Sequence, residues 1–292
     1  MDAIGPISEV RAHLPEVVNS LRETVLSHTE TLTSLIHIRQ FEPSLYTHSI
    51  NVCIFALMLG TVQGLSRKDL TALGMGALLH DVGQVYLPLN LLRKPGVYTS
   101  QEQRLMEAHP RLGATMLSQT PGIHADVCRI VVEHHERADG SGYPQHLRGD
   151  AFGLLSQTVA IADIYETMLG SWKGRPPLLP AQAIKELFKH GRDQQLDGIL
   201  VEKMIRCLGI YPIGTLVELS TGERGIVVAA NPGDALRPVV HILWDTTQQP
   251  YATPLKIDLA CPPPGGPSRT IRQILDPVTE GYDIAAYFQE GT

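Results

Sequence analysis

The sequence predicts a mainly α-helical protein with a small antiparallel β subdomain near its C-terminal end. Three observations lead to this fold class. Up to about residue 210, apolar residues recur at the three- and four-residue spacing of amphipathic helices. After Tyr211-Pro212, short β-branched runs alternate with turn residues, which is typical of antiparallel strands. With 292 residues, 43% of them hydrophobic, the chain is long and apolar enough to bury a full core.

The same patterns divide the chain into four segments. A helical leader occupies residues 1–43, a helical domain residues 44–210, a β-rich subdomain residues 211–261, and a Pro/Gly spacer with a C-terminal tail residues 262–292. The leader is amphipathic, and Pro15 suits its first turn, where the missing N–H costs nothing. Its apolar face is explained equally well by packing on its own domain and by forming a homodimer with the leader of a second copy.

Apolar residues at helical spacing predict the successive helices of the helical domain. Two capping sequences mark helix starts, namely Ser66 with Asp69 and Thr99 with Glu102. The helix that starts after Thr99 is expected to carry His109. The other predicted helices cover residues 45–59, 70–79, 125–135 and 154–169, with one or two more between 180 and 208.

Four β-branched runs predict the strands of the β-rich subdomain. They cover residues 215–219, 225–229, 239–244 and 254–259, with turn residues between them. Four strands with tight turns form a small antiparallel sheet or barrel. The Pro/Gly run that follows is expected to be a stiff spacer before a short helix or tail. This part carries no chemical signature, so we expect a structural or regulatory role for it.

The composition argues against several classes of protein. A formal net charge of −6 disfavours a general nucleic-acid binder, which normally presents a basic face. No apolar run approaches the roughly 20 residues that span a bilayer, and the N-terminus has no basic start followed by an apolar core. The four cysteines show no C-x-x-C spacing, so we expect reduced core residues. The sequence thus predicts a cytoplasmic protein with neither a membrane nor a nucleic-acid polymer as its partner.

Seven polar residues end or interrupt the apolar helices, at positions where core residues are expected. Burying so many ionisable groups is costly unless they are paired or bind metal. Five imidazoles and two carboxylates suit two borderline divalent ions, such as iron, manganese, zinc or nickel. Asp81 has two oxygens and is the natural bridge, and bridged ions would activate a water and hold a phosphodiester. The seven residues are His48, His80, Asp81, His109, His134, His135 and Asp163.

The His134-His135 pair opens directly into a Gly/Pro-rich loop at residues 139–144. Neighbouring helical positions point about 100° apart, but near a helix end both rings can converge. The loop glycines allow the backbone to come close to a ligand, because glycine adopts φ angles that other residues avoid. This stretch indicates half of a metal site with a substrate loop attached.

These motifs together resemble the HD-GYP family, the branch of the HD phosphohydrolase superfamily whose members hydrolyse the bacterial messenger cyclic di-GMP. The resemblance covers roughly residues 44–210. It implies an α-helical HD bundle that converts cyclic di-GMP to pGpG and onward to GMP. The motifs are His80-Asp81-Val82-Gly83, Leu92-Arg93-Lys94-Pro95-Gly96, His109-Pro110, His134-His135-Glu136, Asp139-Gly140-Ser141-Gly142-Tyr143-Pro144 and Ala162-Asp163.

The resemblance also implies roles for individual residues. One metal would be held by His48, His80, Asp81 and Asp163, and the other by Asp81, His109, His134 and His135. The catalytic residues would be Asp81 and Gln84. The substrate, cyclic di-GMP, would contact Gly142, Tyr143, Pro144, Lys173 and Arg175. A signalling protein is a further expected partner.

Three features depart from the family pattern. Gln84 stands where the family has a lysine near the scissile phosphate, and it donates a neutral hydrogen bond in place of a charge-assisted one, which is roughly twice as strong. Ser44 replaces the glutamate of members with a third metal, which favours a two-metal site. Further along, Trp172 replaces one of two basic residues, Arg175 keeps the other, and Lys173 is a candidate substitute. A solvated basic loop explains the last two residues equally well.

Two alternatives to this hydrolase stay open. Gln84 and Trp172 favour a catalytically weak or inactive receptor or adaptor, which would bind the messenger and signal through protein contacts. Retention of all seven predicted metal ligands favours catalysis, since a scaffold has no physical need for them. The other alternative is a hydrolase of a different phosphoester, such as another cyclic dinucleotide, and the loop at residues 139–144 favours a dinucleotide.

Overall fold

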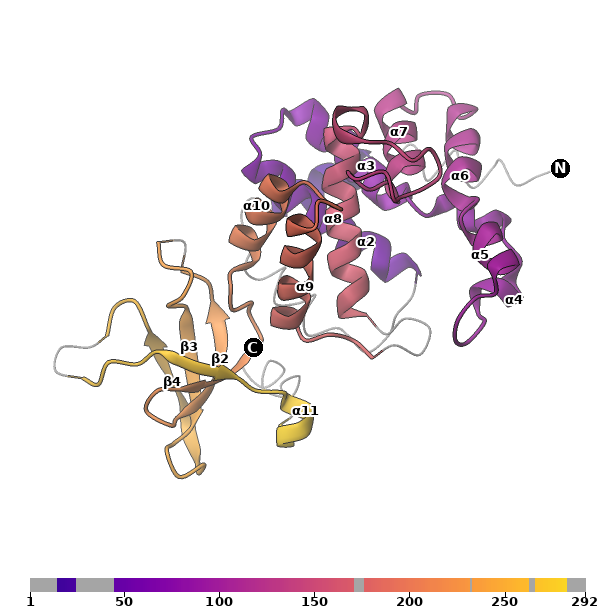
Figure 1. The fold of residues 1–292 in the computed structure, drawn as a ribbon. Coiled ribbons are helices and arrows are strands. Elements are labelled where there is room, and N and C mark those ends of the chain that lie inside the picture. Colours follow the sequence, from indigo (N-terminus) through magenta and orange to yellow (C-terminus); the bar gives the residue numbers. More distant parts are fainter. Residues whose placement is uncertain (1–14, 25–44, 171–175, 232, 263–265, 283–292) are drawn as a thin grey trace. The chain divides into compact units, whose positions relative to one another are not determined.

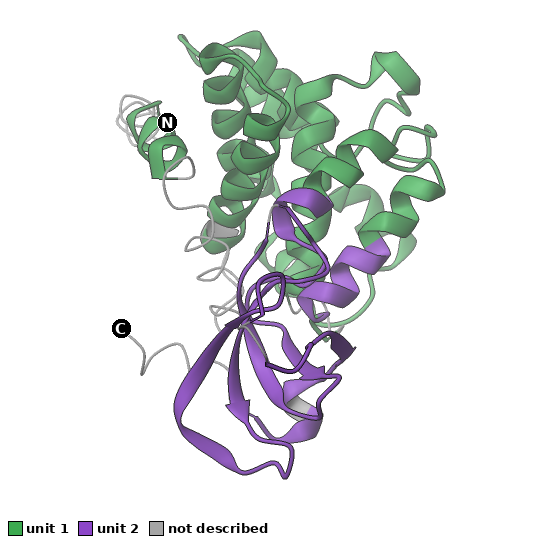
Figure 2. Cartoon of the chain, turned by 90° about the vertical axis from the view of Figure 1, so that its left-hand side faces the viewer, with its two compact units in different colours: residues 1–29, 42–177, 187–204 green, residues 30–41, 178–186, 205–292 purple. Residues whose placement is uncertain are grey.

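The computed structural model describes residues 15–24, 45–170, 176–231, 233–262 and 266–282. This part of the chain forms two compact units (Figure 2). The first unit contains the described residues up to Pro177 together with Leu187–Met204, and the second contains Leu178–Glu186 and the described residues from Ile205 onward. The segment boundaries expected from the sequence stay a prediction. Four positions discussed above lie outside the described residues, namely Ser44, Trp172, Lys173 and Arg175.

Helices build the first unit (Figure 1). α2 packs against α3 and α8, α3 against α7, and α6 against both α7 and the 3-10 turn η1. Phe55 of α2 and Tyr165 of α8 meet edge to face in the core, with ring centroids 5.1 Å apart. In chain order, the helical elements are α2 (Leu45–Val62), α3 (Arg67–Leu79), η1 (Val82–Tyr86), α4 (Leu89–Leu92), α5 (Ser100–Met106), α6 (His109–Ser118), α7 (Ala125–Glu133), η2 (Gly149–Ala151), α8 (Leu154–Leu169), α9 (Pro180–Arg192) and α10 (Gly198–Leu208).

Both predicted capping sequences start helices. The Ser66 side chain accepts the Asp69 N–H at the start of α3. Thr99 and Glu102 form a reciprocal capping box at the start of α5. The helix that begins there does not continue to His109 as expected, because α5 ends at Met106 and α6 starts at His109 with a proline in its first turn. A proline has no N–H to continue the helical ladder, so it suits a first turn and breaks a helix interior.

The amphipathic leader contributes a helix over residues 15–24, which packs on its own domain. Val18 is 1% exposed and belongs to a buried cluster with residues of α3, α6 and α7. A Cβ built on Gly74 would come within 2.6 Å of the Val18 side chain, so the glycine makes room for it. This contact accounts for one apolar position of the leader. The homodimer stays a prediction.

An antiparallel sheet with the strand order β4-β3-β2-β1-β5 forms the β-rich part. The strand β1, which lies between β2 and β5, is buried along its whole length, because Val217 and Leu219 enter one apolar cluster and Leu216 enters another. The structure has a fifth strand where the sequence analysis expected spacer and tail, and β5 pairs with β1 through Val217 opposite Ile274. The strands are β1 (Leu216–Leu219), β2 (Arg224–Ala229), β3 (Val239–Trp244), β4 (Pro250–Asp258) and β5 (Ile271–Ile274), and a one-turn helix α11 (Pro277–Glu280) follows them.

None of the described helices combines the length and the hydrophobicity that crossing a bilayer requires.

Candidate metal centre

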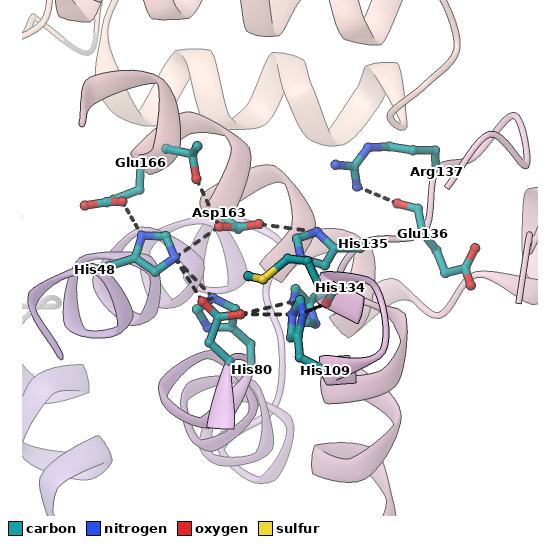
Figure 3. Close-up of polar contacts among 12 residues, drawn as sticks. His48, His80, His109, His134, His135, Glu136, Arg137, Asp163 and Glu166 are labelled. Carbon is teal, nitrogen blue, oxygen red and sulfur yellow. Dashed lines mark hydrogen bonds and ion pairs between the residues drawn. The ribbon is translucent and has the colours of Figure 1, made fainter. Parts of the chain in front are cut away.

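All seven predicted metal ligands come together in the helical unit (Figure 3). They form two groups, and within each group one potential ligand atom per residue lies within 4.8 Å of the others. The residues come from α2, α8 and the ends of α3, α6 and α7. The first group is Asp81, His109, His134 and His135, and the second is His48, His80 and Asp163.

Three of the histidines are oriented in the same way by a backbone carbonyl at a helix end. The Nδ1 atoms of His80, His109 and His134 lie 2.7, 2.7 and 2.8 Å from the carbonyl oxygens of the residues three positions earlier. His80 and His134 directly follow the last residues of α3 and α7, where carbonyls lack helical partners. For His109, the freed acceptor is the Met106 carbonyl, because Pro110 has no N–H to reach it.

This orientation leaves lone pairs that face one another. A carbonyl oxygen only accepts, so each Nδ1 carries the proton and, in a neutral ring, Nε2 carries the lone pair. The Nε2 atoms of His109 and His134 lie 3.3 Å apart. Burial and neighbouring imidazoles hold the pKa of both His134 and His135 well below its usual range, so these rings are neutral near pH 7. When both rings are neutral, these two lone pairs repel each other unless a cation lies between them, so this donor set fits a metal ion.

Asp81 turns one carboxylate oxygen toward each group. Oδ1 lies 3.1 Å from His109 Nε2 and 3.8 Å from His134 Nε2, whereas Oδ2 lies 3.4 Å from His80 Nε2 and 3.9 Å from His48 Nε2. Burial alone would raise the pKa of Asp81, but the adjacent imidazoles of His80 and His109 hold it well below its usual range. An ionised carboxylate in this position is suited to bridging two cations.

The second group is completed by a carboxylate that the sequence analysis did not assign. Glu166 forms a hydrogen bond with Nδ1 of His48, and its other oxygen accepts from Asn51 Nδ2 at 3.0 Å. The opposite nitrogen, His48 Nε2, lies 3.2 Å from Asp163. Burial lowers the pKa of His48, but its bonds to Asp163 and Glu166 outweigh burial and raise the pKa to about 11. The two carboxylates around His48 therefore favour positive charge at this position, which a metal ion would also supply.

Glu166 is expected to position His48 for metal binding. Histidine ligands commonly donate their second ring N–H to a carboxylate, and losing that partner costs about 10–100-fold in metal affinity. We expect Glu166→Gln to weaken binding at the second group by about tenfold, because the amide keeps the shape but loses the charge. Competition titration with a manganese chelator would measure this. The exposed Glu202 of α10 offers a control in Glu202→Gln, and equal affinities in the two variants would contradict a positioning role.

The Gly/Pro-rich loop is held against this centre by a buried glutamate. Glu136 is 0% exposed, and its two oxygens accept the backbone N–H groups of Gln145 at 2.5 Å and Leu147 at 3.0 Å. Gly142 lies against the chain that carries Glu136, since a Cβ there would stand 2.4 Å from the backbone nitrogen of Arg137. The loop therefore has a fixed place beside the histidine pair.

Tyr143 and Gln84 each contact a residue of the cluster, and their roles toward substrate stay predictions. The Tyr143 ring stacks on His135 with centroids 4.7 Å apart. Gln84 is buried in η1, and its N–H is bonded to the Asp81 carbonyl at 2.9 Å. Tyr143 thus connects the loop to the clustered histidines, whereas the two basic residues expected to contact substrate lie outside the described residues.

Comparison with protein families supports this description of the chain. Residues 22–200 match the HD domain family, and residues 216–264 match a KOW domain associated with HD domains. The first match covers more than half of the chain and includes all seven clustered residues.

Individual curated proteins are similar to this chain in sequence. A cyclic di-GMP phosphodiesterase of Pseudomonas aeruginosa is 32% identical over 80% of this chain and 56% of its own length. A 3'3'-cGAMP-specific phosphodiesterase of Vibrio cholerae is 29% identical over 63% of this chain and 35% of its own length. The chain therefore spans about half or less of these relatives.

A solved structure shows the same fold. The HDG"Y"P protein Bd1817 of Bdellovibrio bacteriovorus superposes with a TM-score of 0.56 at 22% identity, over 65% of this chain and 60% of its own. Together with the family match, which covers the clustered residues, these comparisons show that the chain belongs to the HD domain family.

Proposed function

We propose that this chain is a metal-dependent phosphodiesterase that hydrolyses cyclic di-GMP to linear pGpG and then to GMP. The observation that carries the proposal is the pair of ligand groups that share Asp81 beside the Gly-Tyr-Pro loop. The relatives named as cyclic di-GMP and 3'3'-cGAMP phosphodiesterases support the reaction class.

Two divalent ions would be held by the seven clustered residues. When bound, they would supply a water that is deprotonated near neutral pH and positive charge against the phosphate oxygens. The chain's own contribution is to fix the donors, since helix-end carbonyls orient His80, His109 and His134, and Glu166 orients His48. Nitrogen and carboxylate donors suit iron or manganese, with zinc or nickel as alternatives.

The substrate would lie against the loop, with Gly142, Tyr143 and Pro144 bordering a guanine base. Lys173 and Arg175 are proposed to contact its phosphates. Gln84, close to Asp81 in η1, would donate a neutral hydrogen bond to the scissile phosphate.

Restoring a cation at position 84 is expected to accelerate hydrolysis. A charge-assisted hydrogen bond is roughly twice as strong as a neutral one, and such donors contribute about 10²–10³ in rate when they face developing charge. We expect Gln84→Lys to raise kcat by at least about tenfold with the metal content unchanged. Gln84→Met is the matched variant without a donor and should be slower than the wild type. An unaltered kcat in both variants would show that this position does not contact the phosphate.

The proposal is tested by incubating the purified chain with cyclic di-GMP and manganese or ferrous iron, followed by chromatography of the products. Hydrolysis that a chelator abolishes and added metal restores is the expected result. Parallel reactions with 3'3'-cGAMP would show which dinucleotide is preferred. Tight binding of cyclic di-GMP to metal-loaded protein without turnover would select the receptor alternative and overturn the phosphodiesterase.

A further inference from the structure

Arg137 carries a cationic side chain beside the clustered histidines. The assignments above give this residue no function. It lies two positions after His135. Its side chain extends to the side where His135 and Asp163 lie, while the carboxylate of its neighbour Glu136 points away from the cluster (Figure 3). The guanidinium therefore stands at the border of the site, and the residue is partly buried.

The guanidinium lacks a counterion among the described residues. Its hydrogen bond runs from Nη1 to the backbone carbonyl of Glu136 at 2.7 Å, and no carboxylate of the described chain lies within ion-pair distance. The Glu136 carboxylate is already occupied by the loop N–H groups. On the side that the guanidinium faces lies Asp163, whose negative charge attracts it from beyond ion-pair distance. A cation removed from water is costly unless a charged or hydrogen-bonding partner compensates it.

Metal binding would leave the positive charge of Arg137 even less compensated. Asp163 is one of the proposed ligands, so its negative charge would be shared with the ion and would compensate Arg137 less. The filled centre would then combine two divalent ions with a fixed guanidinium. The missing component of such a site is an anion, and the planar fork of arginine matches phosphate oxygens in a bidentate way.

We infer that Arg137 is a substrate-binding residue, whose guanidinium receives the phosphate group that is hydrolysed at the metal centre. This inference rests on the proposed function and extends it to the recognition of the anionic group. Arg137 would supply the positive charge that Gln84 does not. The backbone at Arg137 is fixed by its close contact with Gly142, and the adjacent Glu136 fixes the loop.

The test compares Arg137→Gln and Arg137→Lys with Arg104→Gln, which removes the same charge from an exposed residue of α5. Each full-length variant is loaded with manganese, and its metal content, melting temperature, kcat and KM for cyclic di-GMP are measured. Binding of inorganic phosphate to the metal-loaded protein is measured by calorimetry. We expect Arg137→Gln to keep its metal and melting temperature, to lose about 10²-fold in kcat/KM, and to bind phosphate about tenfold more weakly. Arg137→Lys should recover part of both losses.

Two results would overturn the inference. One is a kcat/KM and a phosphate affinity of Arg137→Gln that match those of Arg104→Gln. The other is loss of metal or of folding in both Arg137 variants, which would make the residue structural. If the wild type does not hydrolyse cyclic di-GMP, the proposed function fails separately, and the phosphate titration alone decides whether Arg137 binds an anion.

Discussion

Replacing Asp81 by alanine is expected to abolish metal binding at both groups and to reduce hydrolysis of cyclic di-GMP by about four orders of magnitude. The effect is large because one side chain serves both sites, with Oδ1 3.1 Å from His109 Nε2 and Oδ2 3.4 Å from His80 Nε2. Residues that act as one catalytic unit lose function together, by about 10⁴-fold or more. Metal analysis of the purified variant, followed by the chromatographic assay with excess manganese, would measure both losses.

His80→Ala is the informative comparison with Asp81→Ala. His80 belongs to the second group. We expect near-complete loss of metal in this variant too, because His80 is itself a ligand of the second group and its Nε2 lies 3.4 Å from the Asp81 carboxylate that both groups share. Asp150→Ala, which removes an exposed carboxylate of η2, should keep full metal content and activity. An Asp81→Ala variant that retains its metal would contradict the shared-carboxylate geometry.

Much of this centre could be predicted because its residues break an apolar pattern. His80 and Asp81 end a helix of buried alanines, glycines and leucines, and Asp163 lies among ten buried positions of α8. Such interruptions are costly without a ligand, so sequence alone predicts that they serve a site. The spacing could not show how each ring is turned. The ring orientation depends on hydrogen bonds to the carbonyl three positions earlier, such as the bond from His80 Nδ1 to Ala77. These bonds exist only once the helix end is formed.

Glu166 was accessible to sequence reasoning but was not assigned. It lies three positions after Asp163 in a helix, so both carboxylates share one face of α8. A pair of acids at this spacing on an apolar helix is the signal that would have found it. The partner, His48, is 118 positions away, and nothing in the local pattern identifies it.

The fifth strand illustrates the opposite limit. The segment Ile271–Ile274 carries two polar residues between two isoleucines and is less than half as long as the nine-residue strand β4. Its place in the sheet comes from pairing with β1, more than fifty residues earlier, and from Leu275, which enters a buried cluster with Leu216 and Ile226. Long-range pairing of this kind determines whether a short segment with weak β propensity forms a strand.

Substitution of Gly83 is expected to have the second large effect, because this glycine allows η1 to approach α6 closely. A Cβ at this position would lie 2.0 Å from the carbonyl oxygen of His109 and 2.6 Å from the backbone nitrogen of Gly113. Both neighbours are backbone atoms, so they cannot move aside as a flexible side chain would. The separation of these two segments also sets the 3.1 Å distance between Asp81 and His109. A methyl group here would therefore act on both the core and the metal centre.

We expect Gly83→Ala to lower the free energy of unfolding by about 3 kcal/mol, at the upper end of overpacking costs. Metal affinity should fall with it, since Asp81 and His109 would be pushed apart. Urea unfolding followed by far-UV circular dichroism, together with manganese titration, would measure the two effects. Gly198→Ala is the matched control at the start of α10, where the nearest atom to a new Cβ is 3.7 Å away and stability should stay within about 0.5 kcal/mol. If the two alanine variants are equally stable and bind manganese equally well, the close approach of η1 to α6 is not what holds Asp81 in place.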